Sequence, residues 1–223
     1  MFDLFTITSG RTLYLNRLIR SISQQNHYLI KKHLIIFQNN SYEESAFLNV
    51  PSEYLAKIEV IAYPEKQSVG AVLNKYSSKL DAPLTMKLDD DALVRSQDFF
   101  AHAWQISQII PNAVFSPFPV GLINNLGGVP SSERYVKYSE QTDTFYTLRK
   151  VNHVGGFARI SDTSLLKRVE FSDSHNEDTE FSSFCSQNNI PMFYLDNCLI
   201  IEHQESTLGQ HARYGETYFK GRF

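Results

Sequence analysis

The feature that most constrains the fold of this chain is the alternation of strand-like and helix-like segments over its first ~90 residues. Short runs rich in β-branched, aromatic and leucine residues, each followed by polar or turn-forming residues, predict strands. These runs are DLFTI (3–7), HLIIF (33–37), KIEVIAY (57–63) and LTMKL (84–88). Apolar residues spaced i, i+3, i+4 and i+7 predict a helix at about 12–25, and SVGAVLNKYSSKL predicts another at 68–80. The alternation is typical of an α/β fold with a parallel sheet and right-handed crossovers.

The rest of the chain is less regular. A helix is predicted at 96–110, with Ser96 as its N-cap and Pro111 after its end. The longest stretch that contains Gly, Pro, Ser and Asn is 120–143, where we expect an irregular loop. Strands are predicted at 113–118, 192–195 and 197–203, and helices at 162–169 and 175–187.

Composition narrows the class of protein. With 223 residues, 42% of them hydrophobic, the chain can bury one sizeable core, so we expect a single domain. A net charge of −3 provides no global basic field that would recruit nucleic acid or an anionic membrane. No run of about 18 apolar residues and no secretory N-terminus is present, so we expect a soluble, cytoplasmic protein. Cys185 and Cys198 have no paired metal or redox spacing and are expected to be reduced core residues.

Three consecutive carboxylates, Asp89, Asp90 and Asp91, follow the fourth predicted strand. Ligands of parallel α/β sheets bind outside the carboxyl ends of the strands. Alternate residues of an extended segment point to the same side, so Asp89 and Asp91 could act together on Mg²⁺ or Mn²⁺, which in turn hold diphosphate oxygens. An EF-hand is excluded because Val94 stands where that loop needs glycine. A solvated acidic turn explains the triplet alone equally well.

Six blocks, in order across nearly the whole chain, resemble the GT-A-fold glycosyltransferases of the large family-2-like group. They are FTITSGRTLYLNRLIRSISQQ, LIIFQNNS, SVGAVLNKYSSKLDAPLTMKLDDDALV, VGGFARIS, NEDTEF and LIIEHQES. The resemblance implies a GT-A (Rossmann-like) α/β domain over 1–223, with a mostly parallel central sheet flanked by helices and a smaller, mixed second half. It divides the chain into a nucleotide-binding half (1–95), a donor/acceptor half (96–203) and a C-terminal tail (204–223).

The resemblance also implies which residues bind the nucleotide-sugar donor. Gln38 stands where the family usually has an aspartate that accepts from the uracil ring; an amide both accepts and donates, so Gln38 or Asn39 is a candidate for base recognition. A surface arginine explains Arg11 equally well, and a tight bend explains Gly155 and Gly156 equally well. The full set of donor-binding candidates is Thr8, Ser9, Arg11, Gln38, Asn39, Gly70, Asn74, Asp89, Asp90, Gly155, Gly156 and Ser206.

For the chemistry, the resemblance implies that Asp91 and His203 bind a divalent metal, Mn²⁺ or Mg²⁺, with Asp89 at the metal or the ribose. The alternative for His203 is a surface histidine at a strand end. Asp178 is expected to be the general base that deprotonates the acceptor hydroxyl, with Glu177 orienting it or taking its place. Acidic residues at the start of a helix, favoured by the helix dipole, are the alternative for this pair.

The function implied is transfer of one sugar from a nucleoside-diphosphate sugar, UDP-linked by preference, to a hydroxyl acceptor. That acceptor is expected to be a glycan or glycolipid of a bacterial surface polysaccharide, and the displacement is expected to be metal-assisted and inverting. Peripheral contact with a membrane stays open, and no nucleic-acid partner is expected. Two alternatives remain: a sugar-phosphate nucleotidyltransferase, whose Gly- and Arg-rich loop is missing here, and a non-catalytic sugar-nucleotide or glycan-binding module.

Overall fold

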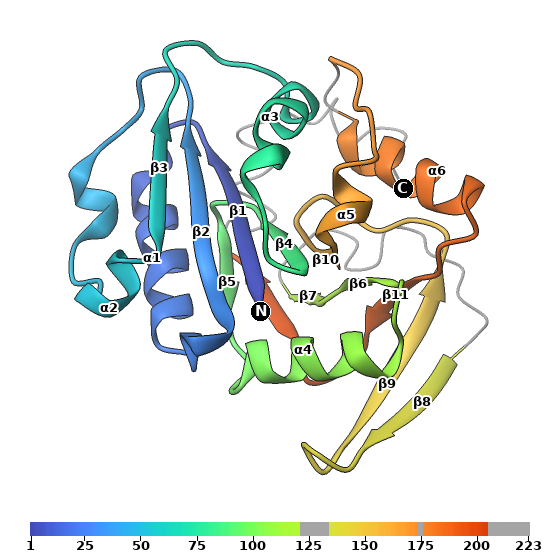
Figure 1. Cartoon of the computed structure of the whole chain (residues 1–223). Helices are drawn as coiled ribbons and strands as arrows, with labels where there is room; N and C mark the ends of the chain where they lie inside the picture. Colours follow the sequence, from blue (N-terminus) through green and yellow to red (C-terminus); the bar gives the residue numbers. More distant parts are fainter. Residues whose placement is uncertain (121–133, 174–175, 205–223) are drawn as a thin grey trace.

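The computed structural model describes residues 1–120, 134–173 and 176–204, which form an α/β domain with two sheets (Figure 1). The larger sheet has nine strands in the order β3-β2-β1-β4-β10-β6-β11-β9-β8, and the smaller has three in the order β5-β12-β7. The strands of the larger sheet are β1 (Phe2–Thr8), β2 (Ile30–Phe37), β3 (Ile58–Ala62), β4 (Leu84–Leu88), β6 (Val114–Ser116), β8 (Arg134–Ser139), β9 (Thr144–Val151), β10 (Ala158–Asp162) and β11 (Met192–Leu195). Those of the smaller sheet are β5 (Ala92–Val94), β7 (Phe118–Val120) and β12 (Ile200–His203).

The first half of the chain has the predicted architecture. Strands β1 to β4 are parallel, with β1 between β2 and β4. Helices α1 (Thr12–Ser23) and α3 (Val69–Tyr76) lie where the periodicity predicted them. A 3-10 helix (Glu44–Phe47) and the short α2 (Ser52–Leu55) make up the crossover from β2 to β3 and were not predicted, because neither is long enough to show a helical repeat.

The second half is mixed, and two predictions there are wrong. Residues 134–139 of the expected irregular loop form β8, which pairs with β9; its residues are exposed on both faces apart from Ser139, so it shows no alternation of apolar and polar residues. Residues 121–133 lie outside the described part. Helix α4 (Phe99–Ile109) begins after Asp98, and the Ser96 hydroxyl accepts instead from Ile200 N–H at 2.5 Å, so Ser96 anchors β12 and is not a helix cap.

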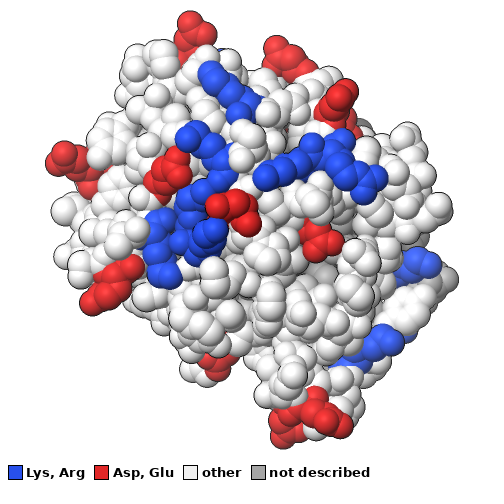
Figure 2. Space-filling model, viewed as in Figure 1, with Lys and Arg blue, Asp and Glu red and all other residues white. Residues whose placement is uncertain are grey.

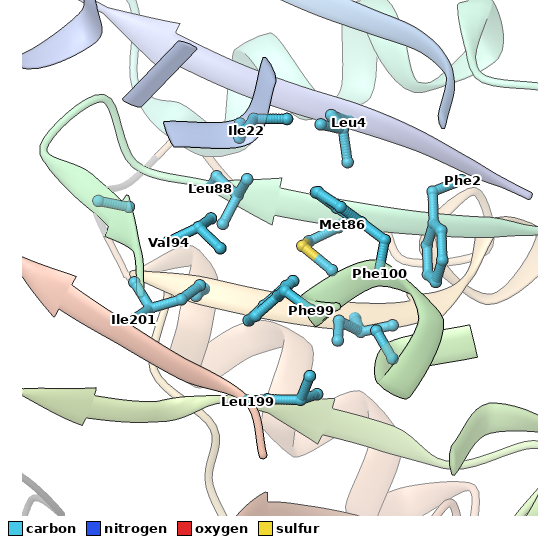
Figure 3. Close-up of a cluster of buried hydrophobic side chains, with 14 of the residues drawn as sticks. Phe2, Leu4, Ile22, Met86, Leu88, Val94, Phe99, Phe100, Leu199 and Ile201 are labelled. Carbon is cyan, nitrogen blue, oxygen red and sulfur yellow. The ribbon is translucent and has the colours of Figure 1, made fainter. Parts of the chain in front are cut away.

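Helices cover both faces of the large sheet. On one face α1, α2 and α4 pack on alternate residues of β1, β2, β4 and β10. Figure 3 shows this core, in which Ile22 of α1, Met86 of β4, Phe99 of α4 and Ile201 of β12 converge. On the other face α3, α5 (Thr163–Leu166) and α6 (Glu177–Gln187) pack on the intervening residues. Because the first core contains residues from both halves of the chain, the halves share one interior.

The surface agrees with the near-neutral composition. In Figure 2, basic and acidic side chains lie interspersed over the face shown, so this face has no field of a single sign. Within the described residues, none of the helices has both the length and the apolar character needed to cross a bilayer. Cys185 is buried and Cys198 half-buried, and both are free thiols, as predicted.

Candidate active site

The acidic triplet lies at the carboxyl end of β4, beside the carboxyl end of β1. Asp90 and Asp91 are buried, and each pairs with the guanidinium of Arg11. Asp90 also accepts from the Thr8 hydroxyl at 2.7 Å and from Arg11 Nε at 3.2 Å. Asp90, whose partners the sequence did not indicate, therefore joins the ends of β1 and β4. Ser9, in the same turn, is exposed.

The charges of this cluster depend on one another. Desolvation raises the pKa of Asp90 to about 6, even though the positive charge of Arg11 opposes the rise. Desolvation would lower the pKa of Arg11, but the carboxylates of Asp90 and Asp91 outweigh it, so that its pKa is raised. Arg11 is therefore a permanent cation between the two acids.

The small sheet brings His203 to the triplet. Strand β12 runs antiparallel to β5 with His203 opposite Ala92, and the backbone N–H of Gln204 donates to the Asp91 carbonyl at 2.8 Å. The imidazole packs against the Phe157 ring, and its Nε2 lies 3.2 Å from Asp91 Oδ2. The two residues predicted to bind metal thus meet although 112 positions separate Asp91 from His203 in the sequence.

A divalent cation fits these two residues. Asp91 Oδ1 is buried and has no hydrogen-bond partner among the described residues. In the same part of the chain no group of three or more His, Cys, Asp or Glu is arranged to hold a metal. One or two protein ligands are nevertheless usual where phosphate oxygens of a substrate complete the coordination. Asp91 and His203 could hold a cation if a diphosphate completed its coordination, and the predicted metal site stays a prediction.

Asp89 belongs to a second cluster, built around Lys87 of β4. Lys87 Nζ donates to Asp89 Oδ1 at 2.7 Å, to Glu177 Oε1 at 3.2 Å and to the carbonyl of Gly156. Desolvation would lower the pKa of Lys87, but Asp89 and Glu177 outweigh it, so the pKa is raised. Asp89 is thus held by an ammonium, and its predicted contact with the metal or ribose stays a prediction.

Asp178 follows Glu177 in the first turn of α6 and is more exposed, with 33% of its side chain accessible against 9% for Glu177. Asp178 Oδ1 accepts from Thr179 N–H at 2.8 Å, and Oδ2 lies 3.6 Å from His153 Nε2. Burial alone would raise the pKa of Asp178, but His153, the Thr179 N–H and the charge of Lys87 lower it to about 2. Asp178 is therefore an ionised carboxylate with an accessible face.

The other predicted donor-binding residues have structural partners. The Gln38 side chain is buried, and its Oε1 accepts from Gln67 N–H at 2.9 Å; Asn39 adopts a left-handed backbone conformation with φ 59°. Asn74 exchanges two hydrogen bonds with the backbone of Phe171. Nucleotide contacts by Gln38, Asn39 and Asn74 stay predictions.

The three predicted glycines differ in how closely their neighbours pack against them. Gly70 lies where a Cβ would come within 2.5 Å of the Ser172 carbonyl oxygen. Gly155 donates its N–H to the Tyr194 hydroxyl at 3.2 Å, and Gly156 lies against Glu177. Their predicted contacts with the donor are untested, and Ser206 lies outside the described residues.

Three site residues were not singled out from the sequence: Lys87, His153 and Arg159. A signal was available for Lys87, because a lone lysine inside the apolar strand LTMKL must either reach solvent or find buried acids. Arg159 gave the same signal in FARIS, and it lies directly opposite Lys87 in the pairing of β10 with β4. His153 precedes the paired glycines and gave no signal of its own.

Comparison with known proteins identifies the fold. No family model and no curated sequence matches this chain. Among solved structures, GalNAc-T7 with UDP, GalNAc and Mn²⁺ superposes with a TM-score of 0.67 at 12% identity, over 94% of this chain and 44% of that one. The S. aureus TarS 1–349 complex with UDP-GlcNAc gives a TM-score of 0.64 at 16% identity, over 90% of this chain and 57% of that one. The Pyrobaculum calidifontis mannosyltransferase PcManGT with GDP-Man and Mn²⁺ gives a TM-score of 0.66 at 12% identity, over 95% of this chain and 59% of that one.

These likenesses confirm the predicted fold class: the chain has the GT-A-like fold of glycosyltransferases, as a single α/β domain. At such low identity they establish the fold alone. The chain also spans only about half the length of these three neighbours, 44%, 57% and 59%.

Proposed function

We propose that this protein is a glycosyltransferase that moves one sugar from a nucleoside-diphosphate sugar to a hydroxyl of an acceptor, with inversion at the anomeric carbon. The observation that supports this most is how the carboxylates at the carboxyl edge of the sheet pair with buried cations. Asp90 and Asp91 share Arg11, and Asp89 and Glu177 share Lys87, whereas Asp178 retains an accessible, ionised carboxylate.

The charge balance favours a divalent cofactor. The site contains five carboxylates, Asp89 to Asp91, Glu177 and Asp178, and three fixed cations, Arg11, Lys87 and Arg159, an excess of two negative charges. An anionic donor would be repelled by that excess, and Mn²⁺ or Mg²⁺ held by Asp91 and His203 would remove it. When bound, such a cation stabilises the charge of the departing diphosphate.

The chain's own groups then perform the proton transfer. Asp178 accepts the proton of the acceptor hydroxyl as the new bond from that oxygen to the anomeric carbon forms. The bond from the anomeric carbon to the diphosphate oxygen breaks, and its electron pair leaves with the nucleoside diphosphate. Glu177 is the weaker candidate for the base because it is more buried and already accepts from Lys87.

We propose that the donor is UDP-linked, and a GDP-linked sugar is the second candidate. Two of the neighbours hold UDP or UDP-GlcNAc, and another holds GDP-Man. We propose a glycan or glycolipid of a bacterial surface polysaccharide as the acceptor, reached on the cytoplasmic side of the membrane. A melting-temperature screen of sugar nucleotides with Mn²⁺ would find the donor, because ligand binding to the folded state raises apparent stability.

The test of this function is Asp178→Asn. We expect kcat for sugar transfer to fall by about 10²- to 10⁴-fold, because the amide cannot accept the proton. Asp81→Asn is the matched control, since Asp81 is an exposed carboxylate paired with Lys31. Transfer by Asp178→Asn at the wild-type rate would refute the assignment. Release of pyrophosphate in place of a nucleoside diphosphate would instead indicate a nucleotidyltransferase.

A further inference from the structure

Lys87 is a buried lysine whose three donor hydrogens face oxygens from three separate segments. Only 4% of the residue is accessible, and its neighbours along β4 are apolar. Its partners are Asp89 just after β4, the Gly156 carbonyl before β10 and Glu177 at the start of α6. Because an ammonium has three N–H donors, this set uses all of them.

The backbone of Gly156 packs closely against the Lys87 ammonium and the Glu177 carboxylate. A Cβ at Gly156 would come within 2.4 Å of Glu177 Oε1 and 3.3 Å of Lys87 Nζ. The turn before β10 therefore passes directly over the ion pair, and a larger residue at position 156 would displace the Glu177 carboxylate.

A second buried cation strengthens the hold on Glu177. Arg159 lies directly opposite Lys87 on β10, and its guanidinium stacks 3.7 Å from the Phe181 ring centroid of α6. Its two terminal nitrogens have no hydrogen-bond partner among the described residues. Like charges directly opposite each other destabilise a sheet. Burial lowers the pKa of Arg159 to about 10, and the negative charge of Glu177 is the largest that opposes this fall. Glu177 also pairs with Lys87, so together with Asp89 it compensates the buried cations.

We propose that Lys87 is a positioning residue for the transfer reaction. By fixing Glu177, the first residue of α6, and the Gly156 turn to the end of β4, it determines where Asp178 stands relative to the donor side of the site. The inference rests on the proposed function and goes beyond it. It states that the position of the proposed base, Asp178 of α6, depends on Lys87 of β4.

The experiment compares Lys87→Met, Glu177→Gln and the double variant with the wild-type protein. If Lys87 acts by holding Glu177, each single variant should lower kcat by about 10²-fold, since a displacement of about 1 Å can cost that much. The double variant should be no slower than the slower single one. Lys79→Met, at an exposed lysine paired with Glu59, is the matched control and should keep the wild-type kcat.

Binding and stability separate positioning from a general loss of structure. The melting temperature should fall in each single variant and recover in part in the double variant, because the double change leaves no unpaired charge between these two side chains. The dissociation constant of the nucleoside diphosphate with Mn²⁺ should change less than kcat in Glu177→Gln.

Three outcomes would overturn the proposal. They are a wild-type kcat in Lys87→Met, reductions of kcat that multiply in the double variant, and melting-temperature shifts that simply add. Each leaves the proposed function standing if the wild-type protein transfers sugar. Absence of transfer by the wild-type protein with every donor tested would overturn the proposed function and this inference together.

Discussion

At the scale of single residues, buried polar groups determine how this protein should respond to pH. His33 of β2 is fully buried, and its ring nitrogens lie 3.0 Å from the Thr6 and Tyr54 hydroxyls. Burial lowers the pKa of His33 to about 3, so the folded protein keeps this imidazole neutral at pH values where the unfolded chain protonates it. Because the pKa of His33 differs between the folded and the unfolded protein, proton binding is linked to unfolding.

We expect acid to destabilise the protein through His33. The unfolded chain binds this proton below about pH 6.5 and the folded protein only near pH 3, so stability is full above pH 6.5 and falls between these values. The slope from this group is about 1.4 kcal/mol per pH unit. Urea unfolding at pH 7, 6 and 5 would measure it. His33→Gln should flatten the dependence, whereas His27→Gln, at a less buried site, should keep most of it; equal slopes in His33→Gln and wild type would contradict the prediction.

The metal ligands give a second prediction for single residues. Asp91→Ala and His203→Ala should each weaken nucleoside-diphosphate binding in Mn²⁺ by about tenfold or more, because each removes one of two proposed ligands. Calorimetry with and without Mn²⁺ measures the effect. Glu202→Gln, next to His203 and paired with Arg95, is the control. Equal weakening without Mn²⁺ would show that these residues bind the nucleotide and not the metal.

The sequence predicted the positions of some site residues but not the contacts between them. The position of Asp89 to Asp91 follows from an apolar strand that ends in acids, and this can be read from LTMKLDDD. The meeting of Asp91 with His203 depends on pairing between β5 and β12, which no local pattern encodes; only the resemblance predicted it. The bonds of Asp90 to Thr8 and Arg11 depend on the register of β1 against β4, so they required the structure.

At the scale of elements, the contact between α3 and the segment after α5 determines how α3 sits on the sheet. Asn74 bonds both the N–H and the carbonyl of Phe171, at 3.0 and 2.7 Å. One turn earlier, Gly70 lets the helix backbone approach the same segment. The spacing G-x-x-x-N places the two residues on one face of α3, where together they dock the helix.

Gly70→Ala should therefore destabilise the protein by about 1–3 kcal/mol, because the new methyl group would overlap backbone atoms that cannot rotate away. Urea unfolding at neutral pH measures the loss. Gly155→Ala is the matched control, since its Cβ would meet only the Tyr194 hydroxyl at 3.6 Å, an ordinary contact. Similar stability of the two variants would contradict the packing argument.

At the scale of the whole molecule, the two halves predicted from the sequence share one core. Strand β10, from the second half, lies between β4 and β6, and the backbone N–H of Phe99, also from the second half, donates to Gln25 Oε1 of the first half at 3.2 Å. The alternation of segments predicted the parallel half correctly. It could not predict β10 at the centre of the sheet, because periodicity reports which residues are buried and not which strand lies beside which.

We expect residues 1–95 to fail to fold alone. The separated half would expose the edge of β4 and the apolar residues that Phe99, Phe100 and Ile201 cover. Circular dichroism during urea titration should show one cooperative transition for the full chain and none for the 1–95 fragment. Cooperative unfolding of the fragment would show that the predicted halves are independent domains.

The place of β10 has a consequence for the newly made protein. Strand β4 ends at Leu88, and its partner ends at Asp162, 74 residues later. At ordinary rates of synthesis these residues take about 4–15 s to emerge from the ribosome. Throughout that interval the nascent chain carries an apolar strand with one unpaired edge, the kind of surface that aggregates or recruits chaperones. The strand that precedes the acidic triplet is thus a part of this protein that needs protection during its synthesis.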